Sequence, residues 1–374
     1  MINMKDTKPY LSKQIITYMG NKRKLLPHIN SVIEDIKGRL GANELVCGDG
    51  FSGSGIVSRL LKIHSKKLYT NDLAGYSRTI NSCFLSTLDS GEMKKLTEIY
   101  DVANTYVDNM CGDEVPSFVS KHWSPSSNNV KINDRAYFTK ENGERIDKYR
   151  YFIENFDSKY RDFLLASLLV ECSIHNNTGG HFAAYYKKDG VGYFGGKNGN
   201  DLKRITMPIT LKPPILYNNS CDSHISQQDT NEWLREIPMV DIMYFDPPYN
   251  KHPYNIYYFL LDIINDWDVD TEIPDTFRGQ PKNWKKSQYN SLVHAEKAFT
   301  DLIDNTKAKY IVVSYNNDGI IPPEKMEKIL NKKGNVEIVE LEHKTYNRLK
   351  GMADYKRKHQ TKKIKEFLWI VECN

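Results

Sequence analysis

The chain has 374 residues, which is enough for one large domain or two modest ones. Its 40% hydrophobic and 26% charged residues are typical of a globular protein with a sizeable core. No apolar run reaches the roughly 18 to 20 residues of a membrane span, so we expect no membrane segment. The net charge of +5 is too small to indicate a polyanionic partner by itself.

The six cysteines are scattered and form no CxxC pair. This pattern argues against a zinc site and a disulfide framework, and it suits a reducing compartment. The N-terminal stretch lacks the apolar region of a secretory signal. We therefore expect a cytoplasmic protein that binds no metal.

The first part of the chain alternates between strand and helix patterns. Apolar runs predict strands over 43–49 and 66–72, and longer periodic runs predict helices over 55–64 and 76–88. From about residue 91 to residue 215 the alternation stops. Two strong helix patterns occupy 144–156 and 162–175, and a polar segment rich in glycine and aromatic residues follows. This middle third has the character of an insertion.

The alternation then resumes to the end of the chain. The later predicted strands are 214–220, 240–245, 309–316, 336–341 and 366–371, and the later predicted helices are 230–237, 257–267 and 323–332. This order predicts an α/β, Rossmann-like fold with a mostly parallel seven-stranded sheet and an inserted, largely helical region. We place the core at 1–84 and 216–374 and the insertion at 85–215.

Ligands of such sheets collect at the carboxyl ends of the strands. Three of these ends carry distinctive residues: the turn DGFSGSG from Asp49 to Gly55, Asp72, and the stretch from Asp246 to Tyr249. The turn lacks the third glycine of GxGxxG and the Gly-Lys-Ser/Thr of a P-loop. An acid before the turn and another after the next strand suit a nucleoside with free ribose hydroxyls. A merely structural tight turn remains the alternative.

The stretch VDIMYFDPPYN, residues 240–250, ends a buried strand with a carboxylate and two prolines. Proline fixes φ and removes a backbone donor, so Asp246 is predicted to be held rigidly at the edge of the sheet.

Three motifs together resemble those of α-group DNA adenine-N6 methyltransferases. They are YMGNKRKLL at 18–26, FSGSG at 51–55 and DPPY at 246–249, in that family's order, with the insertion before DPPY. Further stretches such as YTND, LLASLLVEC, NNTGGHFAAYY and KEFLWIVE are similar to the same family. The resemblance therefore covers nearly the whole chain. DPPY alone is moderately specific, whereas the three motifs in this order are strongly specific.

The resemblance implies methyl transfer from S-adenosylmethionine to the N6 amino group of an adenine flipped out of double-stranded DNA. Asp246 and the carbonyl of Pro247 would accept the two amino hydrogens, Pro248 would stiffen the turn, and Tyr249 would stack on the base. Catalysis would be mainly positioning and electrostatics, without a covalent nucleophile or a metal.

The resemblance also implies a cofactor site. The implied cofactor residues are Tyr18, Gly20, Asn21, Lys22, Asp49, Phe51, Ser52, Gly53, Ser54, Gly55, Asp72, Asp229 and Asp246. Asp72 would accept the ribose hydroxyls, and Asp229 would lie near the cofactor adenine. Surface charge is an alternative for Lys22, and Asp229 also suits a helix N-cap.

Target recognition would lie in the insertion and in roughly 268–292. Candidate DNA-binding residues are Lys22, Arg135, Lys187, Lys188, Lys197, Arg204, Arg278, Lys282, Lys285, Lys286, Lys356, Arg357 and Lys358, since basic side chains contact phosphates and read guanine. A solvated loop is the alternative for the basic runs. Among Tyr254, Tyr257 and Tyr258, we expect at least one to pack a helix.

The expected partners are double-stranded DNA and a separately encoded restriction endonuclease, with the protein itself a monomer. Three alternatives stay open: a cytosine-N4 DNA methyltransferase, an adenine-N6 RNA methyltransferase, and an inactive DNA-binding homologue. Asp246 argues against the first, because the cytosine-N4 group often has serine there. The intact Asp246 to Tyr249 motif argues against the last.

Overall fold

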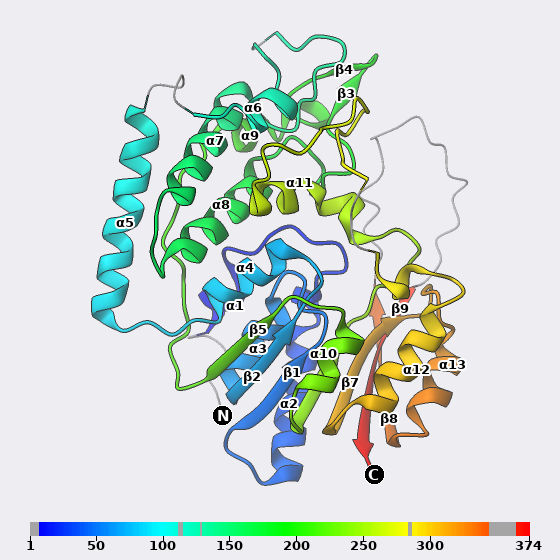
Figure 1. The fold of residues 1–374 in the computed structure, drawn as a ribbon. Coiled ribbons are helices and arrows are strands. Elements are labelled where there is room, and N and C mark those ends of the chain that lie inside the picture. The colour runs from blue at the N-terminus through cyan, green and yellow to red at the C-terminus, as the bar shows by residue number, and fades with distance from the viewer. Residues whose placement is uncertain (1–6, 111–114, 128, 283–285, 344–363) are drawn as a thin grey trace.

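The computed structural model describes residues 7–110, 115–127, 129–282, 286–343 and 364–374 (Figure 1). Seven strands form one sheet, in the order β5-β2-β1-β6-β7-β9-β8. Their bounds are β1 Leu45–Asp49, β2 Ser65–Asn71, β5 Asp222–Ser226, β6 Val240–Phe245, β7 Ala308–Asn316, β8 Gly334–His343 and β9 Ile364–Cys373. The first five strands in that order pair in parallel, and β9 is antiparallel to both of its neighbours. The predicted mostly parallel seven-stranded sheet is confirmed.

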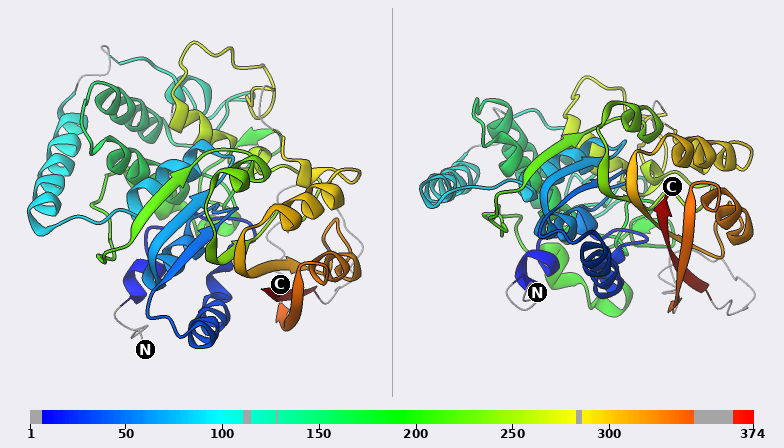
Figure 2. Two further views of the ribbon diagram at one scale, coloured as in Figure 1. Left: turned by 60° about the horizontal axis from the view of Figure 1, so that its bottom comes forward. Right: turned by 90° about the horizontal axis from the view of Figure 1, so that it is seen from below.

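Helices cover both faces of the sheet (Figure 2). Because side chains alternate along a strand, Cys47, Ile242 and Val312 face α2 (Leu26–Leu40) and α3 (Ile56–His64). Met243 and Val313 face the opposite way, toward α10 (Thr230–Glu236), α12 (Ala295–Asn305) and α13 (Pro323–Leu330). The short helix α1 (Lys8–Ser12) packs beside α3. The patterns did not predict α2 or α12.

One predicted strand is wrong. Residues 214–220 form no strand, and the edge position beside β2 belongs to β5. The backbone N–H of Ile215 donates instead to the side-chain oxygen of Gln14 at 2.7 Å, and the Asn218 amide donates to the Leu88 carbonyl at 2.8 Å. An edge strand pairs on one side only and remains partly exposed, so the polar sequence DSHIS suffices for β5.

The region between β2 and β5 is largely helical and lies above the sheet in Figure 1. Its elements are α4 Gly75–Phe84, α5 Ser90–Asn109, α6 Val119–His122, α7 Lys140–Glu154, α8 Arg161–His175, the hairpin β3 Lys187–Lys188 and β4 Val191–Gly192, and α9 Leu202–Thr206. Helix α11 (Tyr254–Asp266) comes from the second half of the chain and shares one apolar cluster with α4, α5, α7 and α8. The described residues also contain three short 3-10 turns, η1 Lys22–Lys24, η3 Lys197–Gly199 and η4 Gln288–Asn290. The division of the chain at residues 84 and 215 stays a prediction.

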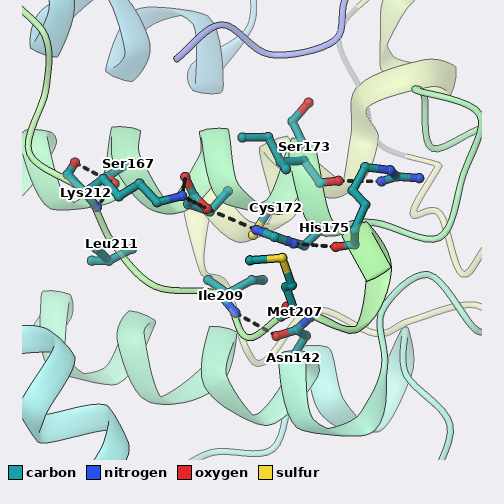
Figure 3. A network of polar contacts seen from close by, with 12 residues as sticks. Asn142, Ser167, Cys172, Ser173, His175, Met207, Ile209, Leu211 and Lys212 are labelled. Carbon is teal, nitrogen blue, oxygen red and sulfur yellow. Dashed lines mark hydrogen bonds and ion pairs between the residues drawn. The ribbon is translucent and has the colours of Figure 1, made fainter. Parts of the chain in front are cut away.

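Helix α8 is tied to its surroundings by buried polar contacts (Figure 3). The Glu171 carboxylate, 2% exposed, accepts from the Lys212 ammonium at 2.9 Å and contacts His175 at 3.1 Å. On the same helix, the Ser173 hydroxyl oxygen accepts from the backbone N–H of Thr17 at 2.9 Å. Helix α8 is therefore linked both to the segment that leads into β5 and to the N-terminal segment that precedes Tyr18.

Within the described ranges, no helix is both long enough and apolar enough to cross a bilayer.

Candidate active site

A pocket lies where the carboxyl ends of β1, β2 and β6 meet. It encloses about 820 Å³, part of which is open to solvent. Seven predicted site residues line it: Tyr18, Phe51, Gly53, Asp72, Asp229, Asp246 and Pro248. The parallel pairing of β1 with β2 and with β6 brings these residues together, although they are up to 230 positions apart in the chain.

The glycine turn forms one wall of the pocket. Gly53 adopts a left-handed backbone with φ +50°, and its N–H donates to the Asp72 carboxylate at 2.7 Å. A Cβ atom there would lie 2.9 Å from the Tyr18 ring, so only glycine allows this approach. Behind the turn, Ser52 and Ser54 are buried, and Gly55 precedes the first residue of α3. At Gly53 the main chain therefore reaches the pocket without an intervening side chain.

Two acids follow the neighbouring strands. Asp72 accepts from the N–H groups of Gly53 and Ala74, which fixes its carboxylate. Burial raises the pKa of Asp72, although these hydrogen bonds oppose the shift. Asp229 accepts from the N–H of Asn231 at 2.9 Å as the N-cap of α10, and it also lines the pocket. The N-cap interpretation of Asp229 is confirmed, and its role toward a cofactor stays a prediction.

Asp49 was expected to belong to the cofactor site, but it does not line the cavity. Its side chain is fully buried behind the turn, where it accepts from the Ser58 hydroxyl at 2.6 Å and the Phe51 N–H at 3.3 Å. Burial raises the pKa of Asp49 to about 7, against the effect of these hydrogen bonds. Asp49 supports the turn from within.

Asp246 belongs to a compact polar network. Its Oδ1 atom lies 3.0 Å from the Lys22 ammonium and accepts from the Tyr249 hydroxyl at 2.5 Å. Glu366 completes the network, 3.1 Å from Lys22 and 2.8 Å from the Tyr249 hydroxyl. Within the described part of the chain, no hydrogen bond reaches Oδ2 of Asp246, so one oxygen remains available in the pocket.

The charges in this network affect one another. Burial raises the pKa of Asp246, Glu366 raises it further, and Lys22 and Tyr249 oppose the shift. Burial also acts to raise the pKa of Glu366, but Lys22 and the hydroxyls of Tyr249 and Ser314 outweigh it and hold that pKa below its usual value. For Lys22, burial acts to lower the pKa, and the two carboxylates together raise it. Asp246 is thus the better proton acceptor of the two acids.

Lys22 was predicted to belong both to the cofactor site and to the DNA-binding residues. Only 4% exposed and held by two carboxylates, it is not available to a phosphate, which corrects the DNA-binding prediction. Its neighbours in the motif are structural: Gly20 accepts from the Lys22 ammonium at 3.2 Å, and Asn21 caps η1 by accepting from the Arg23 N–H.

Glu366 was missed by the sequence interpretation. It is an acid that directly precedes the apolar run Phe367–Val371 of β9, and β9 runs antiparallel to β7. The first residues of an antiparallel strand lie beside the carboxyl end of its parallel-sheet neighbour, here next to Asn316. A lone acid at that place in the sequence was the available signal.

Aromatic rings close the pocket opposite the glycine turn. Tyr18 stacks on Tyr254 and Tyr258 with centroid distances of 5.2 and 4.7 Å. Tyr258 is buried, and its hydroxyl oxygen accepts from the backbone N–H of Met19 at 2.7 Å, so the expectation that one of the three tyrosines packs a helix is confirmed. Tyr254 lines the pocket.

The pocket is acidic. Among the described residues that line it, four are aspartates, Asp72, Asp229, Asp246 and Asp262, and none is basic. Such a lining favours a ligand that carries positive charge and disfavours a polyphosphate. Flat aromatic faces and main-chain donors add contacts for a nucleoside. In the described ranges, no group of three or more His, Cys, Asp or Glu side chains is arranged to hold a metal ion.

The candidate DNA-binding residues divide into two groups. Arg135 donates to the carbonyls of His122, Pro274 and Thr276, and Arg204 donates to those of Ile174 and Asn176. Both guanidinium groups therefore hold the main chain in this conformation, and neither is free to read a base.

The second group is accessible. Lys188, Lys282 and Lys286 are exposed, and Arg278 is half-buried. The Lys187 ammonium lies 3.7 Å from the ring centre of Phe277. This contact joins the β3–β4 hairpin to the loop around residue 277. Lys285, Lys356, Arg357 and Lys358 lie outside the described residues.

Comparison with known proteins agrees with this geometry. The profile of the D12 class N6 adenine-specific DNA methyltransferases matches residues 18–329. The chain is 29% identical to the type II methyltransferase M.NlaIII of Neisseria lactamica, over 96% of this chain and 99% of that protein. It is 28% identical to the type II methyltransferase M.CviAII of Paramecium bursaria Chlorella virus 1, over 88% and 92%.

The modification methylase StsI of Streptococcus sanguinis is 27% identical over 95% of this chain, which spans about half, 51%, of that longer protein. The profile match covers all three motifs and most of the chain. The protein belongs to the D12 class of N6 adenine-specific DNA methyltransferases, a family of S-adenosylmethionine-dependent enzymes that act on DNA.

Proposed function

We propose that this protein methylates the N6 amino group of adenine at a specific site in double-stranded DNA, as the modification enzyme of a restriction–modification system. The observation that carries the proposal is the setting of Asp246. Its carboxylate is anchored through Oδ1, while Oδ2 is left without a described partner in the pocket that Gly53 and Asp72 also line.

The pocket suits S-adenosylmethionine. Asp72 would accept the ribose hydroxyls, Asp229 would lie near the cofactor adenine, and Tyr18 and Phe51 would flank the ligand. The acidic lining matches a ligand that carries a sulfonium and an ammonium group. When bound, the cofactor supplies an electrophilic methyl group. Nothing in the proposed reaction requires a metal.

The chain's own residues would act on the adenine amino group. Asp246 Oδ2 and the Pro247 carbonyl would accept its two hydrogens, which localises the nitrogen lone pair. The prolines hold φ near −65°, so both acceptors keep their direction. The raised pKa of Asp246 suits it to take the proton that the amino nitrogen releases on methylation. Tyr249 would contribute both its anchored hydroxyl and its ring, on which the base would stack.

An adenine inside a duplex cannot reach this pocket, so the base must be flipped out, at a cost of a few kcal/mol. We propose that the accessible group of basic residues, Lys187, Lys188, Arg278, Lys282 and Lys286, contacts the surrounding DNA. The sequence of the basic run around Lys356, Arg357 and Lys358 supports the same role. The predicted domain boundaries at residues 84 and 215 would separate this target-recognition region from the core.

The relatives' names support the biological setting. Two are called type II methyltransferases and one a modification methylase. A separately encoded endonuclease would cut the same site when it is unmethylated. A monomer acting in the cytoplasm, where the DNA is, fits this role.

The direct test is methylation of duplex DNA with radiolabelled S-adenosylmethionine, followed by nucleoside analysis. We expect label in N6-methyladenine at one sequence, and a loss of about 1,000-fold in kcat for Asp246→Asn with cofactor affinity retained. Label in N4-methylcytosine, label in RNA only, or no label on any sequence would overturn the proposal in favour of one of the three alternatives.

A further inference from the structure

We propose that Glu366 is a positioning residue for adenine methylation: it gives Lys22 and the Tyr249 hydroxyl a second anionic partner, which releases Asp246 to bind the substrate amino group. This inference rests on the proposed function and adds to it a residue outside the three motifs.

The Tyr249 hydroxyl faces two carboxylates with a single proton. The Tyr249 hydroxyl has one proton but lies 2.5 Å from Asp246 Oδ1 and 2.8 Å from Glu366 Oε1. It can donate to only one carboxylate at a time. While it donates to Asp246, part of the acceptor capacity of that carboxylate is occupied. A turn of the hydroxyl toward Glu366 removes this competition.

The positive charge of Lys22 is divided between two acids. Two carboxylates share one ammonium, since Lys22 lies 3.0 Å from Asp246 and 3.1 Å from Glu366. Without Glu366, the whole positive charge would act on Asp246 and weaken it as an acceptor. With Glu366 present, part of the Lys22 charge acts on Glu366, so Asp246 remains the stronger proton acceptor, and Lys22 remains anchored whichever way the hydroxyl points.

Glu366 is more deeply buried than Asp246. The Glu366 side chain is 7% exposed, against 20% for Asp246, and it does not line the pocket among the described residues. It is also fixed from behind by the Ser314 hydroxyl at 3.0 Å. Glu366 therefore lies behind Asp246 and acts through Asp246, Tyr249 and Lys22.

The titration directions support this division of roles. Burial and the negative charge of Glu366 both raise the pKa of Asp246, whereas the pKa of Glu366 is held low. The other titratable groups that interact with Asp246 are Asp49, Tyr244 and Tyr254, and Glu366 also faces Tyr244. These groups are unchanged when Glu366 is replaced, so a shift of the Asp246 pKa can be assigned to Glu366.

Glu366→Gln tests the proposal, because glutamine keeps the shape and loses the charge. We expect kcat to fall about tenfold to hundredfold. Lys22 then acts on Asp246 alone and lowers its pKa, so the acid limb of the kcat/KM profile moves to lower pH. Cofactor affinity without DNA, measured by calorimetry, stays within about twofold of wild type, as does the flipping signal from 2-aminopurine at the target base. Glu366→Asp keeps the charge and holds the acid limb in its wild-type position.

Glu372→Gln is the matched control. Glu372 lies on the same strand and also accepts from a tyrosine hydroxyl, that of Tyr310 at 2.9 Å, but at the far end of β9. Wild-type kcat and an unshifted acid limb in Glu366→Gln would overturn the proposal, and so would equal losses in both glutamine variants. If Glu366→Gln does not fold, a shifted acid limb in Glu366→Asp contradicts the proposal and an unshifted limb with lowered kcat supports it. A wild-type enzyme that methylates no adenine refutes the proposed function itself.

Discussion

The pocket and the inserted region use charged side chains in opposite ways. In the pocket, Asp72, Asp229 and Asp246 follow strand ends and converge on one cavity. In the inserted region, Arg135 and Arg204 direct their guanidinium groups at main-chain carbonyls, and exposed lysines remain for a partner.

The difference follows from how each region holds its backbone. A parallel sheet satisfies its own hydrogen bonds and aligns the strand ends, so a side chain placed there is free for a ligand. Irregular segments leave carbonyls unpaired, and arginine, with five donors, is well suited to bind them. Four variants can sharpen or break this comparison.

The largest expected effect is at the glycine turn. Gly53→Ala adds a Cβ 2.9 Å from the Tyr18 ring at a φ of +50°. Tyr18 must move, so we expect cofactor affinity to fall about tenfold or more, since a shift of about 1 Å in a site can cost two orders of magnitude. Gly41→Ala is the control, with φ +59° and nothing within 4 Å. Equal affinity in both variants would show that the close approach of the turn to Tyr18 does not matter.

A smaller pair of effects separates structural from DNA-binding basic residues. Arg135→Met should lower the free energy of unfolding by about 2 to 3 kcal/mol, because it removes the guanidinium hydrogen bonds to three carbonyls. Lys188→Met should leave the melting temperature unchanged and reduce the salt dependence of DNA binding by about one phosphate contact. If Arg135→Met instead keeps wild-type stability and loses sequence preference, Arg135 reads bases and the comparison fails.

The smallest effect is a pH dependence of stability. Burial raises the pKa of Asp49 from its ordinary value of 3.8 to about 7 in the folded protein. Between these two pH values the folded protein therefore binds a proton that the unfolded chain has released. Its contribution to the free energy of unfolding therefore falls as pH rises from about 4 to 7. Asp49→Asn should flatten this part of the curve in thermal unfolding, and the exposed Asp304→Asn should not. A curve for Asp49→Asn that parallels wild type would contradict the burial of a titrating carboxylate there.

The sheet and most of the pocket could be predicted because local sequence determines them. Apolar runs identified six of the seven strands, and the residues after β1, β2 and β6 met as the parallel topology requires. The prediction of a strand at 214–220 is wrong because an apolar run that follows prolines can be extended without pairing to another strand. The edge strand β5 was missed because an exposed edge strand needs few apolar residues.

Long-range partners could not be predicted. Nothing local shows that Lys22 and Glu366, 344 positions apart, meet beside Asp246. The same is true of Arg135, whose carbonyl partners at 274–276 come from another part of the chain. Composition identified these residues as basic or acidic, but only the fold determines which partner each one finds.

The bond from Thr17 to Ser173 limits how this enzyme can be re-engineered. Helix α8 lies within the inserted region, yet it anchors the residue next to Tyr18, which lines the pocket at the carboxyl ends of the strands. Exchanging the whole insertion for that of a relative, in order to obtain a new target sequence, would remove this anchor. A graft that starts after His175 would preserve it, and specificity should therefore be transplanted from the segment that begins with Asn176.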